Sequence, residues 1–436
     1  MDYALSEEQQ AFQATAGRFA KQKLAPHYPK RATEDRIDRA LLKEMGSLGL
    51  IGVDLPEKYG GLGATSTTSG VIIEQIAYGD FNASYVQLLA SLMGGMVAQH
   101  ASPDIAQQWL PRLISGEAII GLGLTEPRGG SDAANLTLRA EKSGNGYRLN
   151  GEKTSMSFAD QCDAAVIFAR TGRIEDGARG VSAFFVDLNQ KGITRTHFDD
   201  IGTKPVGRGS VFFDDVFIPA ECLMAEENKG FSKIMSGFDY SRALIGLECI
   251  GPAQASVDEA WQYTTGRVAF ERPIAQFQGV SFPLAEAETQ LTMMRQLCYY
   301  TLSLRDRGLA HTAEAAMCKW YVPKVACEII HQCLLTHGHY GLHHGSAVPS
   351  ALRRRDGIAN RRRYRANSEA RYRPRKGRTN SRPVRETAPR NAKGIRIDAR
   401  RLELRLIAPA EGDVADGYAV DAGLPQFRIG GAKFPQ

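Results

Sequence analysis

The spacing of the apolar residues changes twice along this chain of 436 residues, and this double change restricts the possible folds more than any other feature. Over roughly the first 115 residues, apolar side chains recur every three or four positions, as in amphipathic helices. From about residue 121 to 222 they alternate, as in half-buried strands, and from Gly230 the helical spacing returns. The sequence therefore predicts an α+β chain with an N-terminal helical domain, a middle antiparallel β domain and a C-terminal helical bundle.

Local signals place the elements within each part. Ser6 followed by Gln9 is typical of a capping box at a helix start, and Pro26 ends that helical run. Gly144, Asn145 and Gly146 separate two alternating runs and predict a hairpin. Further helices are expected over residues 36–50, 68–77, 83–100, 103–113, 230–270, 283–307 and 312–335. We expect domains over residues 1–120, 121–225 and 226–341, followed by a basic tail over 342–436 that is either disordered or frameshifted.

Charge and cysteine usage narrow the class of protein. The formal net charge is +6, but much of the arginine excess lies between Arg353 and Arg401, so the total says little about the folded part. The seven cysteines are scattered and have no metal-ligand spacing, which predicts a reducing compartment and no structural metal. No apolar run reaches membrane-spanning length, and residues 1–12 lack the basic and apolar pattern of a signal peptide. We expect a cytoplasmic protein without a membrane segment.

The junction between the first helical part and the β part is rich in groups that suit a ligand. It reads GLGLTEPRGGSD over residues 121–132. Its glycines allow the backbone to approach a bulky planar molecule, and Thr125 and Ser131 offer hydroxyl groups. Such a loop can hold the edge of a cofactor, although most loops of this composition are plain turns. The GGLGA over residues 60–64 is not interpreted as a dinucleotide fingerprint, because no strand–turn–helix unit of the right length surrounds it.

Several motifs resemble, in order and spacing, segments of the acyl-CoA dehydrogenase family. They are LGLIGVDLPEKYGG, SGEAIIGLGLTEPRGGSD, NGEKTSMSFA, GFSKIMSGFDYSR and GRVAFERPIAQFQ. Arg128 departs from the family form TEPGAGSD, in which that position is glycine. The resemblance covers about residues 1–341. It implies a helical–β–helical subunit in a homotetramer, FAD as cofactor, an acyl-CoA as substrate and an electron-transferring flavoprotein as acceptor.

The same resemblance implies roles for the residues at matching positions. Flavin contacts are implied for Leu122, Leu124, Thr125, Ser155 and Ser157, the two serines standing where the family often has Trp and Thr. Contacts with the ADP half of FAD across a subunit interface are implied for Arg267, Phe270 and Gln278. Contacts with bound CoA are implied for Ser131, Asp239 and Arg242. Without the motifs, Arg267 and Arg242 would be interpreted as ordinary solvated helix cations.

The catalytic carboxylate of the family has no match in this sequence. Family members use it to remove the Cα proton, and place it either in a YEGT-like turn near the C-terminus or on the long helix, where this chain has Ser241. Read one nucleotide later, codons allowed for residues 360–379 encode IGDGTAQIQKLVIARERAG, which resembles the missing segment with an Asp at the base position. We infer a reading-frame shift that begins near Leu342, in the gene or in its sequencing. The catalytic residue itself stays unassigned.

Three strings, EKTSMSFAD, AEAAMCKWYVPKVACE and THGHYG, resemble dehydrogenases of cyclohexanecarboxyl-CoA or its cyclohexene relative, in alicyclic acid and benzoate degradation. Ser91 offers no second acidic residue in the helix that borders the acyl pocket of the family, which favours simple α,β-oxidation. A short or branched-chain acyl-CoA remains an alternative substrate. A flavin monooxygenase on the same fold is a rival enzyme class. A nucleic-acid-binding protein with a basic tail is a rival outside enzymes, with steeply salt-dependent affinity, and we expect no nucleic-acid partner.

Overall fold

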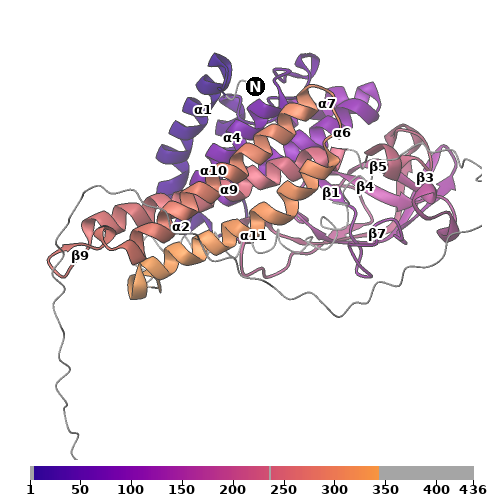
Figure 1. Ribbon diagram of the computed structural model, residues 1–436. Coiled ribbons are helices and arrows are strands. Elements are labelled where there is room, and N and C mark those ends of the chain that lie inside the picture. The colour runs from indigo at the N-terminus through magenta and orange to yellow at the C-terminus, as the bar shows by residue number, and fades with distance from the viewer. Residues whose placement is uncertain (1–3, 235–236, 343–436) are drawn as a thin grey trace, which may run out of the picture. The chain divides into compact units, whose positions relative to one another are not determined.

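The computed structural model describes residues 4–234 and 237–342, all within the first compact unit of the chain (Figure 1). Ser6 caps the first helix as expected: its Oγ accepts from Gln9 N at 3.2 Å, and its own N–H donates to Gln9 Oε1 at 3.0 Å. The larger helical elements of the first part are α1 (Glu7–Phe19), α3 (Arg39–Ser47), α4 (Ser66–Gly79), α5 (Phe81–Leu89), α6 (Gly95–His100) and α7 (Pro103–Ile114). The basic tail lies outside the described residues.

The helix expected over residues 83–100 contains one widened turn. A π-helical segment, η4 (Ala90–Gly94), joins α5 to α6. The backbone at Gly94 lies against Leu55, whose Cδ1 would be 2.6 Å from an added Cβ. The run thus continues from α5 through η4 into α6 and packs closely against Leu55 at Gly94.

The middle part is one sheet with the strand order β6-β7-β3-β2-β4-β5-β8, and β1 also pairs with β4. The strands are β1 (Ile120–Gly123), β2 (Arg139–Ser143), β3 (Gly146–Met156), β4 (Ala164–Arg170), β5 (Val181–Asp187), β6 (Ile193–Arg195), β7 (Gly209–Pro219) and β8 (Leu223–Met224). The predicted hairpin is confirmed: Ser143 pairs with Gly146 across a turn in which Gly144 has φ +57°.

The alternating pattern predicted an antiparallel sheet, but part of the pairing is parallel. β1 pairs with β4 in parallel, from Ile120 opposite Ala164 to Gly123 opposite Ile167, and β2 touches β4 in parallel at one position. The hairpin after β2 and the turn after β3 return the chain to its starting direction before β4 begins. β4 is buried along its whole length, as expected of a strand covered on both faces.

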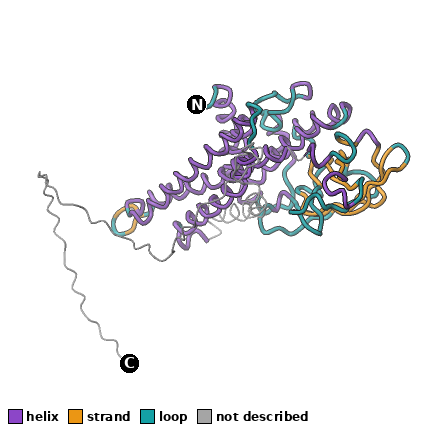
Figure 2. The backbone as a smooth tube through the Cα atoms, turned by 45° about the vertical axis from the view of Figure 1, so that its right-hand side comes forward, coloured by secondary structure: helices purple, strands orange, loops and turns teal. Residues whose placement is uncertain are grey.

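The last part returns to helices and packs against the first. Its elements are α8 (Gly230–Ile234), α9 (Gly237–Gly266), the short hairpin β9 (Val268–Ala269) and β10 (Arg272–Pro273), α10 (Gln278–Asp306) and α11 (Thr312–Thr336). Buried Glu74 of α4 accepts from Arg295 Nε at 2.6 Å and from Tyr299 OH at 2.8 Å, both on α10. Asp306 at the end of α10 accepts from the Ser66 N–H that begins α4. Figure 2 shows the purple helices together, with the orange strands of the sheet at one end.

Two further findings apply only to the part of the chain that the structure describes. None of its helices has both the length and the apolar character that a membrane span needs. Within residues 4–234 and 237–342, no three His, Cys, Asp or Glu side chains gather in a way that could hold a metal ion. The seven cysteines are free thiols, and six of them are buried.

Candidate active site

A cavity of about 360 Å³ lies where α5 and η4, β1, the end of β3, α9 and α11 meet. Seven of the residues predicted from the sequence line it: Leu122, Leu124, Thr125, Ser131, Ser155, Ser157 and Arg242. Lining residues that the sequence analysis did not single out include Tyr85, Leu88, Leu89, Leu92, Asp132, Arg208, Phe231, Phe238, Ile245 and Lys319. The structure therefore brings all five predicted flavin positions and two of the three predicted CoA positions to one place.

Strand β1 divides its side chains between the cavity and the sheet. Leu122 lines the cavity, as does Leu124 just after the strand. Gly121 faces the interior, where an added Cβ would lie 2.4 Å from Met156 Cε and 2.5 Å from Cys162 Sγ. We had expected the glycines of this segment to let a cofactor approach the backbone. At Gly121 the structure gives another reason, which is the close packing of β1 against the sheet.

The loop after β1 is fastened by a buried ion pair. Lys153 Nζ donates to Glu126 Oε1 at 2.7 Å and to the Leu124 carbonyl at 3.3 Å. The other Glu126 oxygen accepts from the N–H and the hydroxyl of Thr137, and Leu138 N–H donates to Oε1. The side chains of Lys153 and Glu126 are 0% and 5% exposed, so they have almost no contact with water. The hydrogen bonds within the protein take its place.

Burial sets the ionisation of this pair. It lowers the pKa of Lys153 to about 8, more than the Glu126 carboxylate raises it. Burial alone would raise the pKa of Glu126. The charge and hydrogen bond of Lys153, with the N–H groups of Leu138 and Thr137, instead hold that pKa below its ordinary value. At neutral pH both groups are charged, and the loop that carries Thr125 is anchored to β3.

The end of β3 forms the polar wall of the cavity. Thr154 N–H donates to the Thr125 carbonyl at 2.8 Å, which holds the loop beside the strand. The pairing of β3 with β7 is irregular between Lys153 and Met156, and Ser155 within this irregularity has φ +54°. Such a φ is uncommon for a residue other than glycine. Ser155 and Ser157 both line the cavity and Met156 between them is buried, as alternation along a strand predicts. Thr154 lines the cavity as well, next to the distorted Ser155, which strict alternation would not allow.

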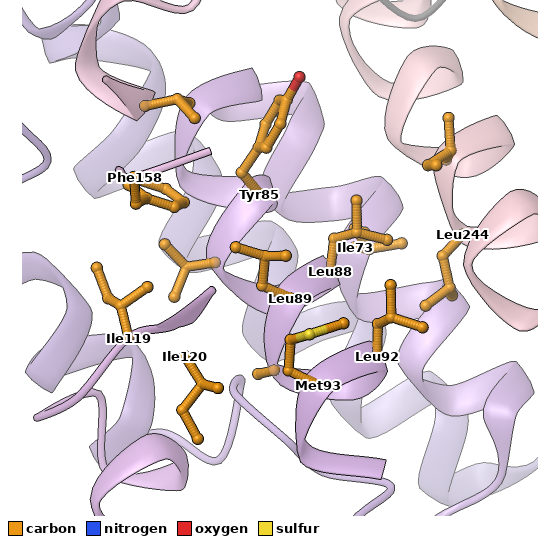
Figure 3. Close-up of a cluster of buried hydrophobic side chains, with 14 of the residues drawn as sticks. Ile73, Tyr85, Leu88, Leu89, Leu92, Met93, Ile119, Ile120, Phe158 and Leu244 are labelled. Carbon is orange, nitrogen blue, oxygen red and sulfur yellow. The ribbon is translucent and has the colours of Figure 1, made fainter. Parts of the chain in front are cut away.

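The apolar wall comes from the helical run of α5 and η4. Leu88, Leu89 and Leu92 line the cavity from this run, and Figure 3 shows them in one cluster with Leu244 of α9. Ser91 does not line the cavity. Its hydroxyl donates to Asp54 Oδ1 at 2.9 Å, on another side of the run. The apolar spacing of the run predicted a helix that faces the core. It could not distinguish leucines that pack in the core from leucines that line the cavity.

The start of α9 supplies the residues predicted near bound CoA. Arg242 lines the cavity and forms an ion pair with Asp239, one helical turn earlier. Asp239 does not line the cavity, and its Oδ2 accepts from the Thr312 hydroxyl at 2.6 Å. Ser241 lines the cavity and is 3% exposed, with its hydroxyl donating to the Phe238 carbonyl at 3.0 Å.

The three residues predicted to hold the ADP half of FAD lie elsewhere. Arg267 follows α9, Phe270 lies in the turn of the β9–β10 hairpin and Gln278 begins α10. All three are exposed, and Phe270 is 89% exposed with φ +53°. None of them lines the cavity, so within this chain the structure does not bring them to the flavin positions.

Charged groups around the cavity are mostly cationic. Arg208, Arg242 and the buried Lys319 line it. Of the lining residues that the structure describes, Asp132 is the sole carboxylate, and it is exposed in the loop after β1. Ser241 stands where the family resemblance allows a base, but a hydroxyl bonded to a carbonyl cannot take a proton from carbon at neutral pH.

The polar and apolar walls fit a flavin. The hydroxyl groups of Thr125, Ser155 and Ser157 line one part and leucines line another, which suits a planar ring system with a polar edge. Gly130 also lines the cavity and lies next to Thr125, whose Cγ2 would be 3.4 Å from an added Cβ.

Known proteins share this architecture over most of its length. Family models for the N-terminal, middle and C-terminal domains of acyl-CoA dehydrogenases match residues 6–117, 121–216 and 228–357. The short-chain acyl-CoA dehydrogenase of Megasphaera elsdenii is 31% identical over 82% of this chain and 94% of its own. The CarC subunit of the caffeyl-CoA reductase–Etf complex of Acetobacterium woodii is 32% identical over 77% of this chain and 89% of its own.

The solved structure of butyryl-CoA dehydrogenase from Megasphaera elsdenii superposes with a TM-score of 0.81 at 28% identity, and covers 85% of this chain and 98% of that one. The chain belongs to the acyl-CoA dehydrogenase family. It is an FAD-dependent enzyme, and its reaction is a flavin-dependent dehydrogenation of the acyl-CoA dehydrogenase type.

Proposed function

We propose that the enzyme oxidises cyclohexanecarboxyl-CoA to cyclohex-1-ene-1-carboxyl-CoA in the degradation of alicyclic acids. The observation that carries this proposal is the cavity itself. One wall is formed by leucines of a single helical run and by Phe231, Phe238 and Ile245, so a compact hydrocarbon ring would be surrounded by apolar groups. The EKTSMSFAD string at the polar wall supports the alicyclic subgroup.

The lining residues take complementary roles in this proposal. Bound FAD supplies the acceptor for the hydride that leaves Cβ. The hydroxyl groups of Thr125, Ser155 and Ser157 hold the polar edge of the ring system, with Leu122 and Leu124 against it. Ser131 and Arg242 bind CoA at the opening, with Asp239 orienting Arg242. The apolar wall excludes water from the acyl group and fixes its orientation.

The proton on Cα needs a base, and we place it beyond the described residues. The alternative reading of residues 360–379 supplies an Asp at the family position, so we propose that the natural enzyme has this aspartate and that the basic tail arises from a frame shift. The intact mass of the protein from its source, together with resequencing of codons 335–436, tests this. A mass that matches the sequence IGDGTAQIQKLVIARE supports the shift, and a mass that matches the printed sequence refutes it.

The substrate is tested by mixing the FAD-loaded natural enzyme, without oxygen, with matched CoA thioesters. Loss of flavin absorbance reports the reductive half-reaction. We expect cyclohexanecarboxyl-CoA to bleach the flavin at least ten times faster than butyryl-CoA or isobutyryl-CoA. The short-chain alternative is favoured by the Megasphaera elsdenii relative, and faster bleaching by butyryl-CoA would establish it instead. Rapid reaction of the reduced flavin with oxygen would favour a monooxygenase.

We also propose the assembly and the acceptor. Exposed Arg267, Phe270 and Gln278 suit a contact with the ADP half of FAD bound in a neighbouring subunit, which requires at least a dimer and in this family a tetramer. Substitution of Phe270 by Asp should lower both the assembled mass and FAD retention. The relative named for an Etf complex supports an electron-transferring flavoprotein as the acceptor.

A further inference from the structure

A tyrosine and an arginine from different parts of the chain meet at the edge of the cavity. Arg208, just before β7, donates from Nη2 to the Tyr85 hydroxyl oxygen at 2.8 Å, and both side chains line the cavity. Tyr85 is 1% exposed. In Figure 3 its ring rises from α5 with the oxygen directed away from the leucine cluster. The planar, cationic guanidinium of Arg208 (the fork) therefore borders a largely apolar cavity.

This pair lies at the end of the apolar wall away from the proposed CoA contacts. Leu92 lies beside the start of α9, because an added Cβ at Gly237 would be 3.7 Å from its Cδ1. Arg242 lies on this first part of α9. Tyr85 precedes Leu92 by seven positions, or about 10 Å along the helical run. An acyl group that enters from the Arg242 side therefore passes Leu92 and Leu88 before it reaches Tyr85.

The guanidinium of Arg208 has more donors than its described surroundings use. It carries five N–H groups in a planar fork. The structure gives it the Tyr85 oxygen and, at 3.7 Å from Nε, Asp200 Oδ2 as an ion-pair partner. Nε is buried and has no hydrogen-bond acceptor among the described residues. Nε faces the Asp200 carboxylate, so an occupant of the cavity would meet the terminal nitrogens instead. Among the described residues these nitrogens donate to the Tyr85 oxygen alone, so the guanidinium has N–H groups that can also bind an oxygen brought by an occupant.

We propose that Arg208, positioned by Tyr85, selects acyl groups that carry a hydrogen-bond-accepting oxygen at the carbon farthest from the thioester. The inference rests on the proposed function and deepens it. The substrate class is then a cyclohexane ring with a hydroxyl or oxo group opposite its carboxyl carbon. The apolar wall holds the ring, and the fork binds the oxygen.

The test compares the binding of two CoA thioesters to the FAD-loaded full-length protein, measured from the perturbation of the flavin spectrum. Binding requires no base, so the chain as printed can be used. The probes are cyclohexanecarboxyl-CoA and 4-hydroxycyclohexanecarboxyl-CoA. We expect the wild type to bind the hydroxylated ring at least tenfold more tightly. R208M should reduce this preference to within twofold while still binding the plain ring, and Y85F should weaken it partly. Arg148→Met, an exposed arginine on β3 of the same sheet, is the matched control.

Three outcomes would overturn the inference. The first is a wild type without preference. The second is an R208M variant that weakens both thioesters equally. The third is an R208M variant that loses FAD, which would mean that the fork binds a flavin oxygen rather than an acyl oxygen. If neither thioester nor butyryl-CoA perturbs the flavin of the wild type, the proposed function fails and this inference fails with it.

Discussion

Lys153 and Glu126, 27 residues apart in the sequence, form an ion pair of 2.7 Å that is almost entirely closed to solvent. Removal of one partner would leave a buried charge without compensation. We therefore expect K153M to lower the free energy of unfolding by roughly 3–5 kcal/mol and to weaken FAD retention. Urea unfolding followed by circular dichroism measures the free energy of unfolding, and the flavin absorbance of the purified protein measures FAD retention. Lys142→Met is the control. It removes the more exposed ion pair between Lys142 on β2 and Glu227, and should change neither the free energy of unfolding nor FAD retention.

The same lysine should leave a signature in the pH dependence of stability. Its pKa is about 8 in the folded protein and near 10.5 when unfolded, so between these values the unfolded chain holds more protons at this site. The stability contributed by Lys153 therefore rises with pH from about 8 to 10.5. The free energy of unfolding of the wild type minus that of K153M should increase across this window. A flat or falling difference would contradict the lowered pKa.

Gly121 should tolerate no side chain. An alanine there would put Cβ within 2.5 Å of both Met156 Cε and Cys162 Sγ, and we expect destabilisation by about 1–3 kcal/mol. Gly279→Ala is the control, because nothing lies within 4 Å of an added Cβ in this helical position, and it should leave stability unchanged or slightly higher. Adding Met156→Ala to Gly121→Ala should restore part of the loss. No rescue by the double variant would indicate that the strain lies in the backbone.

A carboxylate placed at Ser241 should supply the missing base. The side chain is buried and lines the cavity on α9, at the second family position for the base. If the chain as printed lacks a base, S241E should raise the rate of flavin bleaching by an acyl-CoA about 10²-fold, which is typical of a positioned general base. S241Q has the same size without the proton acceptor and should show no gain. Equal rates for wild type and S241E would indicate that a base is already in place.

Much of the fold followed from local patterns. The capping box at Ser6 and the hairpin at Gly144 depend on residues a few positions apart, and both are confirmed. The parallel pairing of β1 with β4 could not be predicted, because alternation gives the face of a strand but not the direction of its partner. The bond between Lys153 and Glu126 joins residues that no short motif relates.

The residues that line the cavity were predicted where a motif indicated them and missed where packing alone brings them there. Thr125, Ser155 and Ser157 were predicted from the resemblance and all three line the cavity, while their contact with flavin stays a prediction. Tyr85 and Arg208 were missed, since a tyrosine in an apolar helix and an arginine before a strand have no distinctive pattern. Phe270 shows a different limit: the contact predicted for it lies across a subunit interface, which the structure of one chain does not test.

The parallel pairing of β1 with β4 also fixes an order of events during synthesis. Ile120 pairs with Ala164, which leaves the ribosome 44 residues later. Until β4 has emerged, β1 has no hydrogen-bonded neighbour in the sheet, and the segment that carries Thr125 is held by its bonds to β3. Domains fold as units, in order from the N-terminus. The β domain therefore becomes able to bind the cofactor only late in its own synthesis. A nascent chain that stops before Ala164 holds every residue of the TEP motif and still cannot assemble the site.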